Sequence, residues 1–396
     1  MKISLRKTAI SLKGSKSISN RALLFAHLAK MQTGKNSKLK NLSDCEDTHY
    51  MKEGLKVLEK QSRIYLGNAG TAVRFLTALA TYTNSKSVIT CSKRMRQRPM
   101  APLLKAVKSI GGKIKIPGNI SSQFISALLM ISPLAKTPTT IKITGEIFSK
   151  PYIKITLNLM RKFGIKATHD KELRNFKIAP NQKFKPCDLF IEGDASSASY
   201  LGEYAALKSI AQHSPQQVTI GNIPHNSIQG DIAFISYLRK MGCKISHKKN
   251  LIKIESPTKL KPLGEIDMNK TPDLVPTFAV LAALAPGTTK ITNIANLRIK
   301  ESDRISALAE NLRKIGTKVK TGKDFIEIHG DSSLVAACCT SAPTSRVAVY
   351  NDHRIAMAFG VLKKTILPHL KIENPSVVKK SYPEFWSDLN KLNRSK

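Results

Sequence analysis

The sequence predicts a two-domain α/β protein built from repeated strand–helix–strand units. Three observations carry this prediction: a length of 396 residues, a phrase that recurs at helix ends, and a second phrase that recurs in alternating strands. A chain of this length corresponds to about two domains with cores of their own. Hydrophobic residues make up 41% of the chain and charged residues 23%, which excludes a disordered protein.

The first recurring phrase joins a helix end to a strand. It consists of an apolar residue, a glycine, and then a lysine within two residues, followed by a β-branched residue or alanine. Glycine readily adopts the left-handed conformation that closes a helix, so each copy predicts a helix end followed at once by a strand. The four copies are Ile110–Ile114, Phe163–Ala167, Met241–Ile245 and Ile315–Val319.

The second phrase alternates like a half-buried strand and ends in turn residues. Its clear copies are Ile141–Gly145, Val218–Asn222 and Lys290–Ile294, and weaker copies are Leu39–Leu42 and Leu370–Asn374. The helix expected near Met51–Leu58 lacks the glycine ending. We therefore expect an N-terminal half that is trimmed relative to the C-terminal half.

The chain is strongly basic. Lys and Arg number 65 against 27 Asp and Glu, a net charge of +38. Such a balance favours anionic partners, among them nucleic acid, a membrane surface or acidic substrates. The lysines are spread along the whole chain, which fits a solvated basic surface as well as a nucleic-acid footprint.

The sequence favours a cytoplasmic protein. Its first residues, Met1–Lys7, contain no apolar core of a signal peptide, and the apolar run Leu274–Ala285 is too short to span a bilayer. The cysteines form no CxxC pair, so we expect reduced thiols and no metal site. They are Cys45, Cys91, Cys187, Cys243, Cys338 and Cys339.

Four expected helix starts combine small or hydroxyl residues with nearby cations. They are Gly14–Arg21, Gly67–Thr71, Ser121–Gln123 and Asp352–Arg354. Unpaired backbone N–H groups and cationic side chains at such positions favour phosphate and carboxylate. Ordinary alternatives stay open: N-capping for Ser15, Ser17 and Ser121, a plain turn at Gly67–Gly70, and a solvated face for most of Arg74, Arg94, Arg96 and Arg98.

Two acids are candidates for catalysis. Asp273 precedes an apolar helix, and Glu301 lies among three cations, so N-capping and structural ion pairing are the respective alternatives. His353 alone is more often structural than catalytic. The sequence has no HExxH, Ser-His-Asp order or GxGxxG, which disfavours metalloproteases, hydrolases and dinucleotide-binding proteins.

Ten strings, in order along the chain, resemble one family: the EPSP synthases, or 3-phosphoshikimate 1-carboxyvinyltransferases. The strings are Gly14–Leu24, Leu66–Ala72, Arg98–Met100, Ser121–Leu129, Ser149–Tyr152, Gly193–Tyr200, Asp267–Asp273, Asn293–Arg304, Asn351–Met357 and Lys380–Phe385. The resemblance covers almost the whole chain, and the ordered set is specific although each string alone is weak.

The resemblance implies a two-domain inside-out α/β barrel, each domain nominally made of three βαβαββ units. The upper domain would run over residues 13–192, and the lower over 1–12 plus 193–396, with the active site in the cleft between them. The trimmed upper domain would lack about two strand pairs. Its sheets would then expose edges or be stabilised by another chain.

The resemblance also implies a reaction: transfer of the enolpyruvyl group of phosphoenolpyruvate to the 5-hydroxyl of shikimate 3-phosphate, with release of phosphate. No metal or organic cofactor is implied. By position, Asp273 would be the base, Glu301 the acid, and Lys16 and His353 would assist proton transfer. Phosphoenolpyruvate would contact Lys16, Gly70, Arg98, Gln123, Arg304, Arg354 and Lys380. Shikimate 3-phosphate would contact Lys16, Ser17, Arg21, Ser121, Ser122, Ser149, Tyr152, Asp273, Asn296 and Lys300.

The chain departs from the family pattern at Lys13, Phe75 and Lys154, where a proline, a proline and an acid are usual. Two other functions compete with this one. An enolpyruvyltransferase acting on UDP-N-acetylglucosamine would share the fold, but Ser149–Tyr152 and Lys300–Arg304 favour the shikimate branch. A basic nucleic-acid-binding protein is disfavoured, since aromatic residues are only 6% and no RNA-recognition, KH or zinc-finger signature occurs. We expect a monomer with small-molecule substrates, no membrane association and no specific nucleic acid.

Overall fold

The computed structural model describes residues 8–333 and 346–394. Its internal contacts divide the chain into two compact units. The N-terminal unit is Gly14–Ile191, and the C-terminal unit combines Met1–Lys13 with Glu192–Lys396.

One four-stranded sheet of the N-terminal unit shows the complete repeat. In chain order its elements are β5 (Lys113–Pro117), α6 (Ser122–Ile131), β6 (Thr139–Thr144), α7 (Lys150–Lys162), β7 (Ala167–His169) and β8 (Asn175–Ile178). The sheet order is β5-β6-β8-β7, with β5 and β6 parallel and the other two pairs antiparallel. This is the βαβαββ unit that the resemblance implied.

The C-terminal unit contains the same sheet twice. The orders β1-β10-β12-β11 and β13-β14-β16-β15 repeat the parallel, antiparallel, antiparallel pattern. The strands of the first are β1 (Thr8–Ser11), β10 (Gln216–Gly221), β11 (Lys244–Lys248) and β12 (Leu251–Ser256). Those of the second are β13 (Gly264–Asp267), β14 (Gly287–Thr292), β15 (Lys318–Thr321) and β16 (Ile326–Gly330).

Within the part of the chain that the structure describes, three further sheets consist of a single parallel pair each. They are β2 (Leu39–Lys40) with β9 (Leu189–Phe190), β3 (Arg63–Tyr65) with β4 (Val88–Thr90), and β17 (Arg346–Val347) with β18 (Lys371–Ile372). Two of the three belong to the N-terminal unit, so the expected trimming of that half is confirmed. Tyr65, Val88 and Phe190, three of the large apolar side chains most exposed to solvent, lie on its two short sheets.

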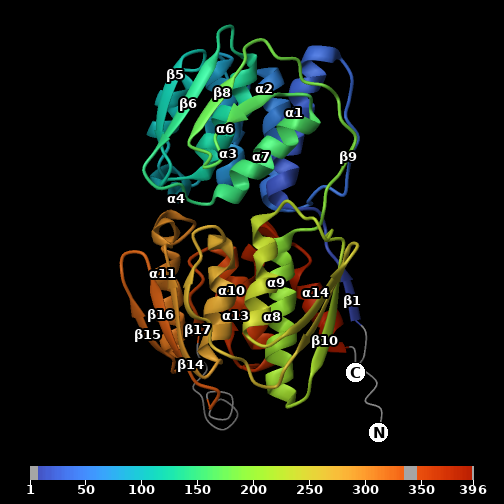
Figure 1. Ribbon diagram of the computed structural model, residues 1–396, viewed down its shortest axis with the longest axis vertical. Helices are drawn as coiled ribbons and strands as arrows, with labels where there is room; N and C mark the ends of the chain where they lie inside the picture. The colour runs from blue at the N-terminus through green and yellow to red at the C-terminus, as the bar shows by residue number, and fades with distance from the viewer. Residues whose placement is uncertain (1–7, 334–345, 395–396) are drawn as a thin grey trace. The chain divides into compact units, whose positions relative to one another are not determined.

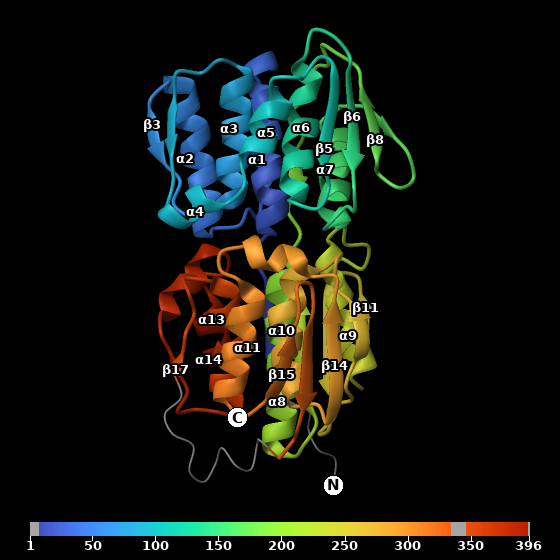
Figure 2. The same cartoon turned by 90° about the vertical axis from the view of Figure 1, so that its left-hand side faces the viewer.

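Helices lie together in the middle of each unit and the sheets cover them from outside (Figures 1 and 2). The remaining helices of the N-terminal unit are α1 (Lys16–Thr33), α2 (Glu46–Lys60), α3 (Gly70–Tyr82), α4 (Lys93–Gln97) and α5 (Ala101–Val107). Those of the C-terminal unit are α8 (Ala195–Gln212), α9 (Phe234–Lys240), α10 (Val275–Ala283), α11 (Arg304–Lys314), α13 (His353–Thr365) and α14 (Phe385–Arg394). Short 3-10 helices are η1 (Ser132–Leu134), η2 (Gly230–Ala233), η3 (Pro272–Leu274), η4 (Ala295–Ile299) and η5 (Pro375–Lys380).

The recurring glycines close helices as the sequence predicts. Gly164, Gly242 and Gly316 have φ angles of 80°, 102° and 89°, and each comes directly after the C-cap residue of a helix, before β7, β11 and β15. Gly111 is also left-handed, but α5 already ends at Val107, so a short turn separates this glycine from its helix. Helix α2, which has no glycine ending, closes with Gln61 in the left-handed region.

The described thiols are free. They are Cys45, Cys91, Cys187 and Cys243, whereas Cys338 and Cys339 lie outside the described residues. Among the described residues, no cluster of three or more His, Cys, Asp or Glu side chains has an arrangement that could hold a metal ion. No helix in that part of the chain has the length and apolar character needed to cross a membrane.

Candidate active site

In the C-terminal unit, aspartates fix the starts of α11 and α13. The Asp303 carboxylate accepts a hydrogen bond from the Ser306 backbone N–H, and that of Asp352 accepts one from the Arg354 N–H. Such caps satisfy backbone donors that a helix start leaves unpaired. The caps also fix the backbone at Arg304 and Arg354, the two arginines of the candidate set in this unit.

Arg304 gathers three carboxylates around one guanidinium. Its Nε lies 2.8 Å from Asp352 Oδ2, and its Nη2 bonds Asp352 Oδ1 at 3.2 Å and Glu301 Oε2 at 2.9 Å. Its Nη1 bonds Asp273 Oδ1 at 3.0 Å. Four of the five guanidinium N–H groups are thus used inside this unit. The structure brings together both candidate catalytic acids, and the ion-pair interpretation of Glu301 is confirmed.

Three neighbouring carboxylates stabilise the positive charge of the Arg304 guanidinium. Burial by itself opposes the charged form, but Asp352, Glu301 and Asp273 outweigh that cost and raise the pKa of the guanidinium above its ordinary value. The side chain is only 1% exposed. Arg304 therefore acts as a permanent cation that orients the carboxylates.

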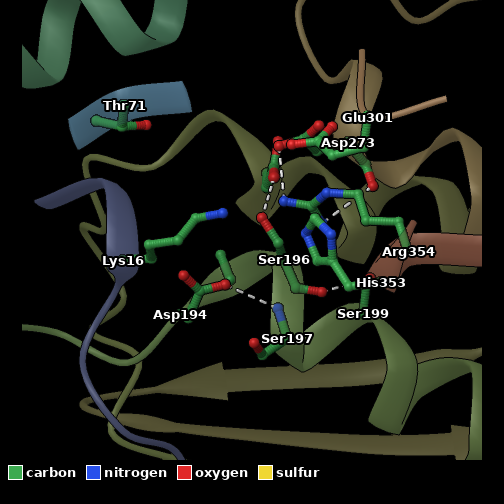
Figure 3. A network of polar contacts seen from close by, with 12 residues as sticks. Lys16, Thr71, Asp194, Ser196, Ser197, Ser199, Asp273, Glu301, His353 and Arg354 are labelled. Carbon is green, nitrogen blue, oxygen red and sulfur yellow. Dashed lines mark hydrogen bonds and ion pairs between the residues drawn. The ribbon is translucent and has the colours of Figure 1, made fainter. Parts of the chain in front are cut away.

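Arg354 and Lys380 complete this network, and Figure 3 shows Arg354 near Asp273. Arg354 Nη2 lies 2.6 Å from Asp273 Oδ2, and Lys380 Nζ lies 3.7 Å from Glu301 Oε1. Asp273 belongs to η3, and the N-cap position of α10 is Leu274, so the N-cap alternative for Asp273 is wrong. The Asp273 carboxylate instead bridges two arginines.

A fourth acid, which the sequence did not suggest, joins the network. The buried Asp231 accepts a hydrogen bond from the Ser196 hydroxyl at the start of α8. Burial, and then the negative charge of Asp273, raise the pKa of Asp231 to about 7, although Arg354 opposes this shift. Asp231 lies in the first turn of η2, but no nearby charge in the sequence links it to Asp273, so only the folded chain reveals its place in the network.

The other candidates of this unit lie around the same network. His353 is the first residue of α13 and is 1% exposed, with its Nδ1 3.7 Å from Asp352 Oδ1. Asn296 is buried in η4, and Lys300 follows η4 partly exposed.

In the N-terminal unit, Arg21 is buried among neutral groups. Its Nε donates to Thr156 Oγ1 at 2.7 Å, its Nη2 to Ser126 Oγ at 3.1 Å, and its Nη1 to the Ser17 carbonyl. Its guanidinium carbon lies 5.2 Å above the Phe75 ring, one of the residues that depart from the family pattern. Burial lowers the pKa of Arg21 to about 10, partly offset by Tyr152.

Lys16 is the first residue of α1 and pairs with an acid of its own unit. Its Nζ lies 3.1 Å from Asp47 Oδ2, which is buried in the first turn of α2. Asp47 is a second residue that the sequence did not single out. Lys16 and Asp47 lie at the starts of two successive helices. A search of the sequence for oppositely charged residues at successive helix starts could have found this pair.

The starts of α3 and α6 form one polar cluster. The Arg74 Nη1 donates to Gln123 Oε1 at 2.5 Å, and Gln123 Nε2 donates to Thr71 Oγ1 at 3.0 Å. A Cβ placed on Gly70 would come within 2.9 Å of Arg98 Nη1, so only glycine permits this close approach. Arg74 and Arg98 are both buried, so a solvated face is wrong for these two arginines.

The hydroxyl candidates occupy helix starts. Ser121 caps α6 by accepting from the Gln123 N–H, so its N-cap alternative is confirmed, and Ser122 is the buried first helical residue. Ser149 precedes α7 with a left-handed φ of 59° and is buried, while Tyr152 lies partly exposed in the first turn. The structure thus places the N-terminal candidates in α1, α3, α6 and α7 and in the residues just before them, except Arg98, which closes α4.

Comparisons with solved structures define the class of the fold. An EPSP synthase from Acinetobacter baumannii matches with a TM-score of 0.72 and 20% identity, over 98% of this chain and 95% of that one. The enolpyruvyl transferase NikO from Streptomyces tendae matches with a TM-score of 0.68 and 15% identity, over 98% and 95%. The inside-out α/β fold of the enolpyruvyl transferases is therefore confirmed.

Sequence comparisons give the family. A family model described as EPSP synthase (3-phosphoshikimate 1-carboxyvinyltransferase) matches residues 3–63, 59–119 and 111–389. The chain is 39% identical to the 3-phosphoshikimate 1-carboxyvinyltransferase of Hamiltonella defensa, over 96% of this chain and 95% of that protein. It is 38% identical to that of Buchnera aphidicola, over 98% and 97%. The chain belongs to the EPSP synthase family.

Proposed function

We propose that this chain transfers the enolpyruvyl group of phosphoenolpyruvate to the 5-hydroxyl of shikimate 3-phosphate and releases phosphate. Membership of the EPSP synthase family makes it a transferase of the shikimate pathway. The observation that carries the proposal is the pair of carboxylates, Asp273 and Glu301, held by the single guanidinium of Arg304. An addition–elimination reaction needs both a general base and a general acid.

The chemistry assigns opposite proton transfers to the two carboxyl groups. Glu301, in its protonated form, would protonate the methylene carbon of phosphoenolpyruvate and leave C2 electrophilic. Asp273 would take the proton of the attacking 5-hydroxyl as the C–O bond forms. The tetrahedral adduct would then lose phosphate and a proton from the former methylene carbon, with Lys16 and His353 assisting.

Cations are the second requirement, because both substrates are anions. Two unit charges about 4 Å apart repel by roughly 4 kcal/mol at an effective dielectric of 20. Fixed cations remove this barrier without reorganising during the reaction. We propose that cations of both units act on the same pair of substrates, as the residue assignments from the family imply.

The binding roles remain as the family resemblance assigns them. Phosphoenolpyruvate would be held by Lys16, Gly70, Arg98, Gln123, Arg304, Arg354 and Lys380, and shikimate 3-phosphate by Ser17, Arg21, Ser121, Ser122, Ser149, Tyr152, Asn296 and Lys300 together with Lys16 and Asp273. Within these sets we refine one role. Because four N–H groups of Arg304 already bond carboxylates, its main task would be to position Glu301 and Asp273.

We further infer a protein that acts as a monomer, since all assigned residues come from one chain. Size-exclusion chromatography with light scattering tests this inference: a mass near 43.6 kDa supports it, and twice that mass contradicts it. Its placement in the cytoplasm stays a prediction from the sequence.

A coupled assay of phosphate release tests the activity. Phosphate should appear only when phosphoenolpyruvate and shikimate 3-phosphate are both present, and Lys16→Ala should lower the rate by about 10²-fold or more. Release with UDP-N-acetylglucosamine in place of shikimate 3-phosphate would instead favour the sister enolpyruvyltransferase. No release with either acceptor would contradict the proposal.

A further inference from the structure

A basic cavity lies in the C-terminal unit and shares no residue with the candidate active site. It has a volume of about 570 Å³, which falls within the range of small-molecule sites. The last turn of α13, the β17–β18 pair and the start of α14 form its walls. Its lining residues are Arg346, Lys363, Lys364, Lys371, Ile372, Glu373, Pro375 and Trp386.

Trp386, the only tryptophan of the chain, is a rigid wall of this cavity. Its Nε1 donates to the Pro375 carbonyl at 2.8 Å, and its ring packs edge-on against Phe385 with 4.8 Å between centroids. A Cβ on Gly360 would come within 2.8 Å of the ring, so the indole lies directly on α13. An aromatic ring fixed in this way loses little conformational entropy when a ligand packs against it.

The cations of the cavity have different tasks. Lys363 is structural, because its Nζ donates to the carbonyls of Pro368 and Leu370 beyond the end of α13. Arg346 Nη2 lies 3.7 Å from the Glu373 carboxylate, and both side chains are largely exposed. Within residues 8–333 and 346–394, the ammonium groups of Lys364 and Lys371 make no hydrogen bond or ion pair. Two cations of the cavity are therefore available to an anion.

Mutual repulsion supports this interpretation. The pKa of Lys363 is lowered by burial and then by the charges of Lys364 and Lys371, so the three ammonium groups lie close enough to repel one another. Stabilisation of the C-terminal dipole of α13 accounts for Lys363 and Lys364, which lie in its last turn. It does not account for Lys371, which lies on the exposed strand β18.

We infer that this cavity binds a free nucleotide, with its base against Trp386 and its phosphates near Lys364 and Lys371. Nucleotides combine an aromatic face with anionic groups, and tryptophan and lysine side chains bind those two parts. A single aromatic residue in a cavity of this volume fits one nucleotide. A track for a nucleic-acid strand would need successive stacking residues. The inference does not depend on the proposed transferase activity.

The fluorescence of Trp386 tests the inference directly, because no other tryptophan contributes. We expect adenosine triphosphate to change this emission saturably. The double variant Lys364→Glu/Lys371→Glu should weaken binding by about tenfold or more, as expected when charge-assisted phosphate contacts are reversed. The matched control is Lys248→Glu/Lys253→Glu, which changes the net charge equally on exposed positions of β11 and β12. This control should bind within about twofold of the wild-type chain.

Two further probes separate the contributions. Inorganic tripolyphosphate should bind more weakly than adenosine triphosphate, because it lacks the base. A short single-stranded oligonucleotide should bind no more tightly than the free nucleotide. The inference is overturned by absence of a saturable signal, by equal loss in the control variant, by equal affinity for tripolyphosphate, or by tighter binding of the oligonucleotide. Phosphate release with shikimate 3-phosphate, measured separately on the same variants, should stay unchanged.

Discussion

Two fully buried arginines, one in each unit, have opposite surroundings. Arg304 of the C-terminal unit bonds the carboxylates of Asp352, Glu301 and Asp273. Arg21 of the N-terminal unit bonds two hydroxyls and a carbonyl, and stacks on an aromatic ring. Accordingly, the pKa of Arg304 is raised above its ordinary value despite burial, whereas burial lowers the pKa of Arg21 to about 10.

The contrast separates two uses of a buried cation. Carboxylates of its own unit neutralise the positive charge of Arg304. This charge therefore serves to orient those acids. Arg21 has no carboxylate partner in the described chain, so its charge is stabilised only when an anion arrives. We propose that the first supports chemistry and the second supports recognition of shikimate 3-phosphate.

The largest expected effect comes from Arg304→Met. Removing the guanidinium leaves Asp352, fully buried, without its ion-pair partner and loosens Glu301 and Asp273. Breaking a buried pair in this way costs about 3–5 kcal/mol of unfolding free energy. Urea denaturation followed by circular dichroism measures the loss. A loss below about 1 kcal/mol would show that the network contributes little to stability.

Glu301→Gln should affect turnover and leave the fold intact. The amide keeps the shape of the side chain but cannot deliver the proton, so kcat should fall by about 10²–10⁴-fold. Steady-state phosphate release gives this number, and the thermal unfolding midpoint serves as the control. Near-normal turnover would remove Glu301 from the mechanism.

Asp231→Asn should stabilise the protein at alkaline pH. Because the pKa of Asp231 rises from 3.8 to about 7 on folding, the folded chain binds an extra proton between those values. Its contribution to stability therefore falls as pH rises through that window and is lowest above it. Asparagine stays neutral and can still accept from Ser196. The variant should exceed wild-type stability at pH 8 and match it near pH 4; equal stability at both pH values would contradict the proposed ionisation.

The smallest effect on stability is expected for Arg21→Met. The buried charge disappears, Thr156 and Ser126 already lie 2.9 Å apart and can bond each other, and methionine packs well against Phe75. The ligand-free unfolding midpoint should stay within about 3 °C of the wild-type value or rise. Differential scanning fluorimetry measures it. A drop comparable to that of Arg304→Met would erase the contrast between the two arginines.

Local rules predicted much of the fold. Helix closure and strand burial depend on a few neighbouring residues. Glycine endings and alternating apolar residues therefore predicted the positions of most helix ends and strands. Trimming was also predictable from the spacing of the repeats. The exposure of Tyr65 and Val88 was not, because it depends on how the rest of the unit packs around the β3–β4 pair.

The sequence predicted which residues form the candidate site, but not which of them pair with one another. The family strings named Asp273, Glu301, Arg304, Arg354 and Lys380, and the structure joins all five in one network. Nothing local in the chain indicates that Asp352 and Asp273 share Arg304, since the pairs are 48 and 31 residues apart. Phe75 departs from the family pattern, and only the folded chain shows that its ring packs against the Arg21 guanidinium.

Calorimetric titration of shikimate 3-phosphate into two variants tests the division between recognition and chemistry most directly. Arg21→Met should lose measurable binding at concentrations that saturate the wild-type chain, whereas Glu301→Gln should bind within about threefold of wild type although it no longer turns over. Equal binding by both variants would contradict the assignment of Arg21 as a residue that binds shikimate 3-phosphate. Loss of binding in Glu301→Gln alone would reverse the proposed roles of the two units.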